Sequence, residues 1–205
     1  MSQRRQRLPR GSGEKLRADI IVAARQLMIE APDGVSMRGV ADAVGVTAPS
    51  IYRHFADKDE LVTAVVVDVF EDLDAAMLAA GAGIEDPLLR LHAYGMAYVR
   101  FALAHPEHYR LATMDPCPRP VVDEMLQQSA WVHMAGTVEE CIRAGVLAGD
   151  PLEVTLDLWA GAHGLASLMI AKPFLPWGDA EAAAERMLVT LALGHADSAS
   201  TLPVR

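Results

Sequence analysis

Five histidines are the residues of this chain best suited to acid–base or metal chemistry: His92, His105, His108, His133 and His163. Catalytic and metal-binding histidines usually belong to short motifs, because the groups must converge on one atom. The sequence contains no HExxH, no GxSxG and no close carboxylate–histidine cluster. Its two cysteines, Cys117 and Cys141, have no CxxC partner, which disfavours a metal site and a disulfide framework. The residues therefore predict no catalytic site, metal or cofactor; an enzyme stays as an alternative for a metal assay and a hydrolase screen.

A second pattern, within residues 37–55, points to nucleic-acid chemistry. Ala41 lies four residues before Gly45, and Ile51 lies six residues after it. A helix-turn-helix needs a small residue where its helices touch, a glycine in the turn and an apolar anchor on the second helix. Gly45 suits the turn because a residue without Cβ readily adopts a positive φ. This spacing predicts helices at 37–44 and 47–55 joined by a tight turn.

The charge distribution agrees with a nucleic-acid-binding head. The formal net charge of the chain is −9, yet residues 1–58 carry +4 and residues 59–205 carry −13. The field close to the contact decides whether a protein docks on phosphates, so an acidic total does not exclude DNA binding. The distribution predicts a basic head on an acidic body.

The string GVSMRGVADAVGVTAPSIYRHFADKDEL, from Gly34 to Leu61, resembles the DNA-binding head of the TetR/AcrR repressor family. The resemblance is close over residues 14–62; further along, the chain matches in helix pattern and length. It implies that the amino end of the second helix enters the major groove. The DNA contacts expected on this basis are Arg38, Thr47, Ala48, Pro49, Ser50, Tyr52, Arg53, His54 and Lys58. Packing within the head is the alternative role of Tyr52 and His54, whereas Ile51 and Phe55 are expected in the core.

Apolar periodicity, caps and prolines predict an all-α fold of about nine helices, with an N-terminal three-helix helix-turn-helix head and a C-terminal helical regulatory bundle. Ser36, Asp150 and Asp179 are expected to cap helices that begin at 37, 151 and 180. The expected organisation is a flexible basic arm at 1–13, the DNA-binding domain at 14–60, a ligand-binding and dimerisation domain at 61–196 and a disordered tail at 197–205. The sequence contains no run of eighteen apolar residues, so no membrane span is predicted.

The resemblance also implies a homodimer formed by the last two helices, and a ligand pocket in the body. On the helix at 151–171, one apolar face is expected to meet the partner and the other to line the interior, and the pattern leaves open which is which. Trp159 and His163 resemble a Trp-x3-His-Gly signature of one subgroup. The expected interface residues are Leu158, Gly161, Leu165, Leu168, Met187 and Leu191. The expected pocket residues are His92, Met96, Tyr98, Val99, Met114, Trp131, Met134, Trp159 and His163, with core packing as the alternative for each.

These expectations combine into a cytoplasmic, ligand-responsive regulator that binds double-stranded DNA. A repressor released from a palindromic operator by a small apolar or aromatic effector is the favoured form. An activator, and a ligand-sequestering protein that no longer reads DNA, are the alternatives. The presence of Arg38, Tyr52, His54 and Lys58 argues against the last of these.

Overall fold

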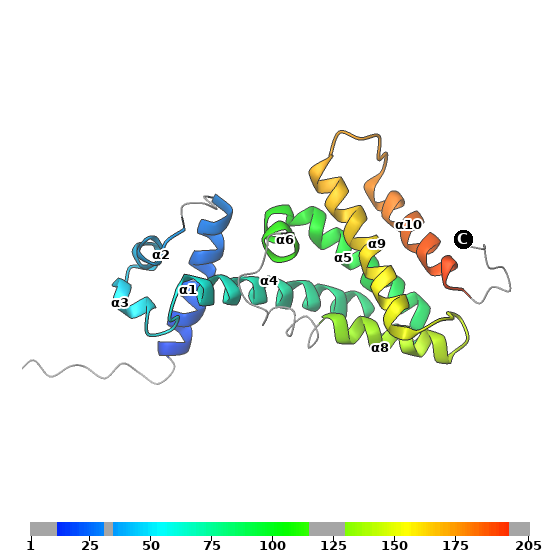
Figure 1. Cartoon of the computed structure of the whole chain (residues 1–205), viewed down its shortest axis with the longest axis horizontal. Coiled ribbons are helices and arrows are strands. Elements are labelled where there is room, and N and C mark those ends of the chain that lie inside the picture. Colours follow the sequence, from blue (N-terminus) through cyan, green and yellow to red (C-terminus); the bar gives the residue numbers. More distant parts are fainter. Residues whose placement is uncertain (1–11, 31–34, 115–129, 197–205) are drawn as a thin grey trace, which may run out of the picture. The chain divides into compact units, whose positions relative to one another are not determined.

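A computed structural model describes residues 12–30, 35–114 and 130–196, and within these ranges the chain is all-α, as predicted. Contacts divide it into two units whose boundary falls inside α4, between Asp68 and Val69. Figure 1 labels the helices: α1 Ser12–Glu30, α2 Met37–Val44, α3 Ala48–Ile51, α4 Lys58–Gly81, α5 Pro87–Ala104, α6 Pro106–Thr113, α8 Ala130–Arg143, α9 Pro151–Ala171 and α10 Ala180–Gly194. The expectations for residues 1–11, 31–34, 115–129 and 197–205 lie outside the described residues.

The first unit, the head, consists of α1, α2, α3 and the start of α4 (Figure 1). Its centre is fully buried and apolar, with Ile20, Val40 and Ile51 each at 0% exposure. The guanidinium carbon of Arg17 lies 5.1 Å from the centre of the Phe55 ring, so α1 also covers the end of the helix-turn-helix. Arg25 of α1 pairs with Asp68 of α4 at 2.8 Å, which fastens α4 to the head.

The second helix of the motif is shorter than predicted. Helix α3 ends at Ile51 instead of reaching Phe55, and residues 52–54 form a turn. Backbone hydrogen bonds nevertheless continue, because the amides of His54 and Phe55 both donate to the carbonyl of Ile51. Sharing one carbonyl tightens this last turn, as is common where a helix ends.

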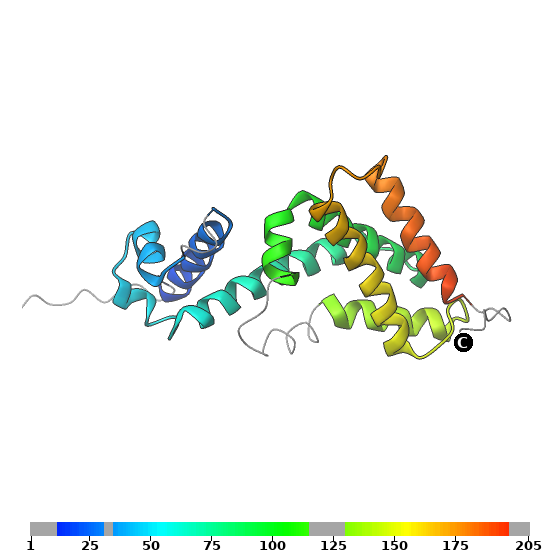
Figure 2. The same cartoon turned by 45° about the horizontal axis from the view of Figure 1, so that its top comes forward.

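The second unit, the body, is built around α5, which packs against α6, α8, α9 and α10. Figures 1 and 2 show α9 and α10 running antiparallel, side by side. The predicted caps are present: the carboxylates of Asp150 and Asp179 accept backbone N–H groups at the starts of α9 and α10. One buried cluster joins the three helices α5, α8 and α9, and it comprises Leu91, Val138, Cys141, Leu147, Val154 and Leu158.

Helix α9 is apolar on several sides. Within the described residues it is the one helix long and apolar enough to cross a membrane by length and composition. The core helix of a soluble protein passes the same test. Val154, Ala162 and Ala166 are buried, and α9 is covered by α5, α8 and α10. This packing accounts for the apolar composition of α9.

A close approach between α4 and α5 gives the first testable prediction. A Cβ built on Gly81 would lie 2.3 Å from Cε1 of the Tyr94 ring, which is buried and cannot bend away. We therefore expect Gly81→Ala to lower the free energy of unfolding by about 1–3 kcal/mol. Gly136 of α8 is the control, because a Cβ there meets nothing within 4 Å. Gly136→Ala should raise stability by roughly 0.5–1 kcal/mol. Urea unfolding measures both, and equal effects of the two substitutions would contradict the prediction.

Candidate functional site

The turn of the helix-turn-helix has the geometry that its sequence predicts. Ser36 caps α2, and its hydroxyl accepts the Gly39 amide at 3.1 Å. Gly45 adopts a φ of 75°, and its N–H and that of Val46 return to carbonyls at the end of α2. A side chain at Gly45 would be strained in this conformation. The turn therefore fixes the direction in which α3 leaves α2.

Helix α3 and the turn after it have one buried side and one exposed side. Ile51 and Phe55 are buried, as predicted, at 0% and 1% exposure. Tyr52 is 53% exposed, and Arg53 is exposed beside it. Thr47 precedes α3 but does not cap it through its side chain; its hydroxyl lies 3.0 Å from that of Ser50. The polar groups of this segment are therefore available to a partner.

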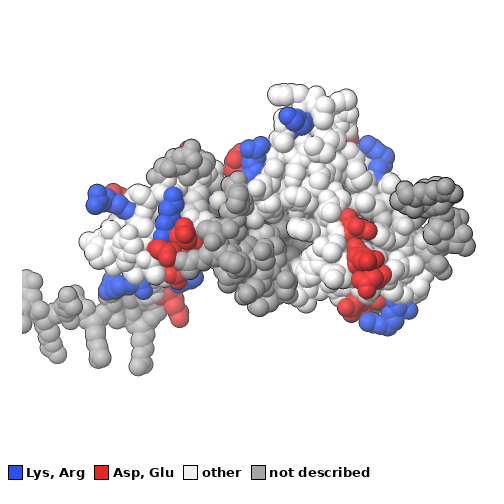
Figure 3. Space-filling model, in the orientation of Figure 1, with Lys and Arg blue, Asp and Glu red and all other residues white. Residues whose placement is uncertain are grey.

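The structure leaves all nine predicted DNA contacts accessible. Arg38, Thr47, Pro49, Tyr52, Arg53 and Lys58 are exposed, and Ala48, Ser50 and His54 are half-buried. Lys58 is the first residue of α4, directly after Asp57, whose carboxylate accepts the amide of Glu60. In Figure 3, the head carries several Lys and Arg residues around a group of Asp and Glu, and the body has a stripe of Asp and Glu with Lys and Arg at its edges. The head thus presents cations together with hydrogen-bonding groups, the combination that phosphate and base contacts require.

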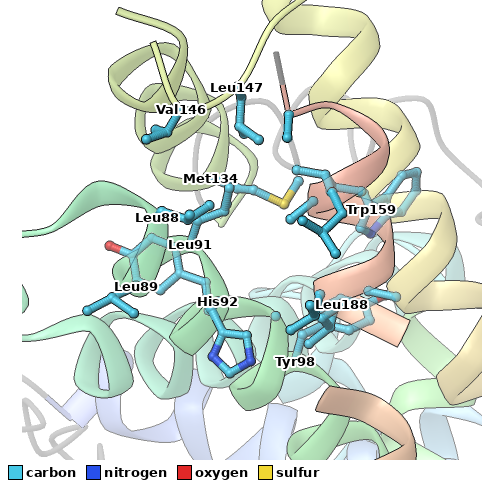
Figure 4. A pocket seen from close by; sticks show the side chains of 18 of the residues that line it. Leu88, Leu89, Leu91, His92, Tyr98, Met134, Val146, Leu147, Trp159 and Leu188 are labelled. Carbon is cyan, nitrogen blue, oxygen red and sulfur yellow. The ribbon is translucent and has the colours of Figure 1, made fainter. Parts of the chain in front are cut away.

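The body contains a cavity of about 240 Å³ between α5, α8, α9 and α10, which we call the inner cavity (Figure 4). Four predicted pocket residues line it: His92, Tyr98, Met134 and Trp159. Sequence reasoning missed much of its wall, including Leu89, Val146, Leu188, Val189 and Leu193. These aliphatic residues come from two helices and a turn, and no periodicity within one helix marks them as neighbours.

A second cavity of about 880 Å³ lies between α4, α8 and α9, and we call it the outer cavity. Trp131, a predicted pocket residue, lines it, and its ring meets that of Trp159 edge to face at 6.0 Å. Four residues line both cavities: Met77, Tyr98, Met134 and Trp159. Met96, Val99 and Met114 line neither. The first two are buried in the core, and Met114, which directly follows α6, is 41% exposed.

His163 belongs to a polar cluster behind the wall instead of lining either cavity. Its Nδ1 lies 2.7 Å from the Tyr109 hydroxyl and 3.3 Å from that of Tyr98, and the two hydroxyls are 2.9 Å apart. Nε2 lies 3.3 Å from the hydroxyl of Ser167. Burial raises the pKa of both tyrosines and lowers the pKa of His163. The cluster is therefore neutral near pH 7, with neutral imidazole and protonated phenols.

The lowered pKa of His163 predicts a pH dependence of stability. As the pH falls below about 6.5, the unfolded chain takes up a proton that the folded protein resists, so stability falls with pH. We expect the melting temperature to drop between about pH 7.5 and 5.5, and to drop less in His163→Asn, which does not titrate. His105→Asn, at an exposed histidine, is the control. Equal slopes for wild type and His163→Asn would contradict the prediction.

The predicted interface residues divide into two groups. Leu158 and Leu165 are buried inside the protomer, and Gly161 is covered by Leu191, whose Cδ1 would lie 2.3 Å from a Cβ on the glycine. Leu158 and Leu165 therefore pack in the core of the protomer, whereas Gly161 and Leu191 contact each other and are half-buried. Leu168 and Met187 are 52% and 39% exposed. On α9, the accessible stripe near Leu168 also contains Ala160 and Gly164.

Family models of known proteins match residues in both the head and the body. The family model "Bacterial regulatory proteins, tetR family" matches residues 20–65, and the model "Tetracyclin repressor-like, C-terminal domain" matches residues 91–191. Among curated relatives, the HTH-type transcriptional regulator Rv1816 of Mycobacterium tuberculosis is 26% identical over 144 residues. That match covers 69% of this chain and 62% of the relative, so the chain spans about three fifths of the relative's length.

Solved structures show the same fold. A protein of unknown function from Rhodococcus sp. RHA1 is similar with a TM-score of 0.77 and 26% identity, covering 96% of this chain and 100% of that one. RolR in complex with its ligand resorcinol is similar in fold, with a TM-score of 0.67 at 17% identity over 91% of this chain and 90% of RolR. The matched models and relatives are regulators, not enzymes. The chain is therefore a member of the TetR family of bacterial regulatory proteins, with an N-terminal helix-turn-helix and a C-terminal helical domain.

Proposed function

We propose that this regulator is a cytoplasmic homodimeric repressor that leaves its operator when a small molecule enters the body. The observation that carries the proposal is the pairing of an accessible recognition surface with an apolar cavity whose wall includes α4, the helix that begins at Lys58. The description of the carboxyl-terminal model as repressor-like supports the direction of regulation. The complex of RolR with resorcinol supports a small effector.

On the head, we propose that α3 enters the major groove. Ser50 and Arg53 then meet bases or phosphates, while Ala48 and Pro49 offer apolar contact to thymine methyl groups. Arg38 approaches from α2 to contact a guanine or a phosphate. Tyr52, His54 and Lys58 hold the phosphate backbone. In a dimer, two such heads read half-sites about one helical turn apart, roughly 34–36 Å, so the operator is a palindrome.

Helix α4 is the proposed link between ligand and DNA. Its Met77 lines both cavities, and Phe70 and Leu73 line the outer one. Its other end carries Lys58, and the Arg25–Asp68 ion pair near the middle of the helix fastens it to α1. A ligand that displaces Met77 therefore acts on the same helix that positions a phosphate contact. Differential binding of about 1–3 kcal/mol is enough to change operator affinity roughly 5- to 150-fold.

Binding to the DNA just upstream of the chain's own gene tests the proposal. Fluorescence anisotropy at low and moderate salt should show specific binding that weakens steeply as salt rises, because phosphate contacts release counterions. A reporter gene behind the same DNA should be expressed less when the protein is present. Higher expression would establish an activator instead. If the protein binds this DNA and random DNA equally weakly, the operator must be sought among genomic fragments that the protein selects. If no genomic fragment binds specifically, the proposal is overturned.

A further inference from the structure

The inner cavity has a wall that is almost entirely hydrocarbon. None of the residues that line it is Lys, Arg, Asp or Glu, and the polar groups come from His92, Tyr94, Tyr98 and Trp159. Placing a carboxylate or phosphate in such a site removes its hydration and supplies no opposite charge in return. The wall therefore selects against anions as well as cations.

The cavity has an open end and a closed end. Four lining residues are exposed and mark the mouth, namely Leu89, Val146, Val189 and Leu193, with exposures of 39% to 65%. All four are aliphatic. Tyr98 and Leu158 line the same cavity at 6% and 8% exposure and so belong to its closed part. A bound molecule consequently meets aliphatic side chains at the mouth and the Tyr98 ring together with aliphatic side chains inside.

Tyr98 connects the closed end to the polar cluster. A neutral imidazole carries one N–H, and with this proton on Nε2, 3.3 Å from the Ser167 hydroxyl, Nδ1 accepts from the Tyr109 hydroxyl at 2.7 Å. In this tautomer the Tyr98 hydroxyl is the donor to Tyr109, at 2.9 Å. All the hydroxyl and imidazole protons of Tyr98, Tyr109 and His163 are thus donated within the cluster. The row of hydrogen bonds begins at the Tyr98 hydroxyl, whose oxygen accepts none of them.

The oxygen of Tyr98 is therefore an acceptor. Burial raises the pKa of Tyr98, so its hydroxyl keeps its proton near pH 7. A phenol oxygen that donates its own proton still has lone pairs, and these can accept a hydrogen bond from a bound molecule. A hydroxyl group of a bound molecule is a donor that is neutral and small enough for an otherwise apolar site.

The volume limits the size of the guest. A cavity of roughly 150 Å³ lined by apolar residues holds benzene. The inner cavity, at about 240 Å³, has room for a benzene ring with a hydroxyl and a short alkyl chain. Met77 and Met134 stand between this cavity and the outer one, and their unbranched side chains can shift to admit a longer molecule.

We propose that the effector is an uncharged, elongated apolar molecule with one hydroxyl group, which it donates to the oxygen of Tyr98 while its hydrocarbon end points to the mouth. This inference rests on the proposed function only in calling the molecule an effector. The binding site and its selectivity stand on the cavity and the cluster alone.

Three probes of equal skeleton test the selectivity of the full-length protein by titration calorimetry: 4-propylphenol, propylbenzene and 4-propylbenzoate. At pH 7 the phenol is neutral and the benzoate is ionised. We expect the phenol to bind roughly 2- to 12-fold more tightly than propylbenzene, because it makes one additional hydrogen bond to the protein and one net hydrogen bond changes affinity by about this factor. The benzoate should bind more than about 100-fold more weakly than the phenol, because its charge has no partner in the wall.

Tyr98→Phe is the decisive variant, and Tyr94→Phe is its matched control. Both tyrosines lie on α5 one turn apart, line the inner cavity and are 6% exposed, but only Tyr98 belongs to the cluster. Tyr98→Phe should bind the phenol as weakly as propylbenzene and leave propylbenzene affinity unchanged. Tyr94→Phe should keep the preference for the phenol.

The proposal is overturned if wild-type protein binds no probe, binds the benzoate as tightly as the phenol, or does not distinguish the phenol from propylbenzene. Loss of the preference in Tyr94→Phe to the same extent as in Tyr98→Phe also overturns it. The wild-type ranking decides the matter even if Tyr98→Phe does not fold. Anisotropy with upstream DNA, measured without probes, separates this result from the proposed function: DNA binding without probe selectivity refutes only the inference, and the reverse refutes only the regulator's proposed mode of action.

Discussion

Replacing Arg38 and Lys58 together with alanine is expected to lower the affinity for the operator by more than about 100-fold. Each such side chain on a base or phosphate contributes on the order of 1–3 kcal/mol, and a dimer has four of them. Both side chains are exposed on the head, one on α2 and the other at the first residue of α4. The dependence of log affinity on log salt should also become less steep, by about 0.9 for each phosphate that the variant no longer neutralises.

The matched control removes two positive charges of the same residue types, one arginine and one lysine, from the body. Arg143→Ala with Lys172→Ala changes one arginine and one lysine, both exposed, at the ends of α8 and α9. Anisotropy should show operator affinity within about twofold of wild type, because these charges lie outside the head. Similar reductions in the two double variants would mean that net charge, and not the recognition surface, governs binding.

The head could be predicted in detail because its structure follows from local chemistry. Ser36 caps α2 through a hydrogen bond three residues away, and Gly45 supplies the positive φ that the turn requires. Ile51 is buried where the spacing places an anchor. Each of these features depends on neighbours close in sequence. The end of α3 was predicted less well, because Tyr52 and His54 lie in a tightened turn that helix periodicity does not distinguish from a helix.

The faces of α9 could not be assigned from the sequence, because the helix is apolar around most of its circumference. Leu158 and Leu168 are separated by ten residues on the same helix, yet one lies in the core and the other is 52% exposed. Which side is covered depends on where α5, α8 and α10 pack. That information lies in the fold, not in the period of one helix.

The polar cluster around His163 also depends on contacts between helices that the sequence does not predict. His163 and Tyr98 stood out in the sequence, but Tyr109, which lies between them, comes from the short helix α6 and has no motif around it. It is fully buried and supplies the shortest hydrogen bond of the cluster to His163. Only the packing of α6 on α5 brings its hydroxyl to that position. Sequence reasoning therefore identified Tyr98 and His163 but neither Tyr109 nor the hydrogen bonds that join the three residues.

The second large effect is expected at the face of α9 that the protomer leaves accessible. Ala160, Gly164 and Leu168 follow one another at intervals of four residues and form one stripe, so a helix of a second copy can approach closely there. A Cβ on Gly164 meets nothing within 4 Å inside the protomer. Gly164→Arg should therefore leave the fold intact and prevent the close approach, by its size and its charge.

Sedimentation equilibrium should find a dimer for wild type and a monomer for Gly164→Arg, while circular dichroism stays the same. Operator affinity should fall by more than about 100-fold, because the second half-site no longer binds as part of the same molecule. Gly136→Arg is the control, since a Cβ on Gly136 also meets nothing within 4 Å, and this glycine lies on α8 beside the outer cavity instead of on the α9 stripe. A Gly164→Arg variant that remains a dimer with full operator affinity would place the interface on another face of the body, whereas a monomer with full affinity would remove the dimer from DNA recognition.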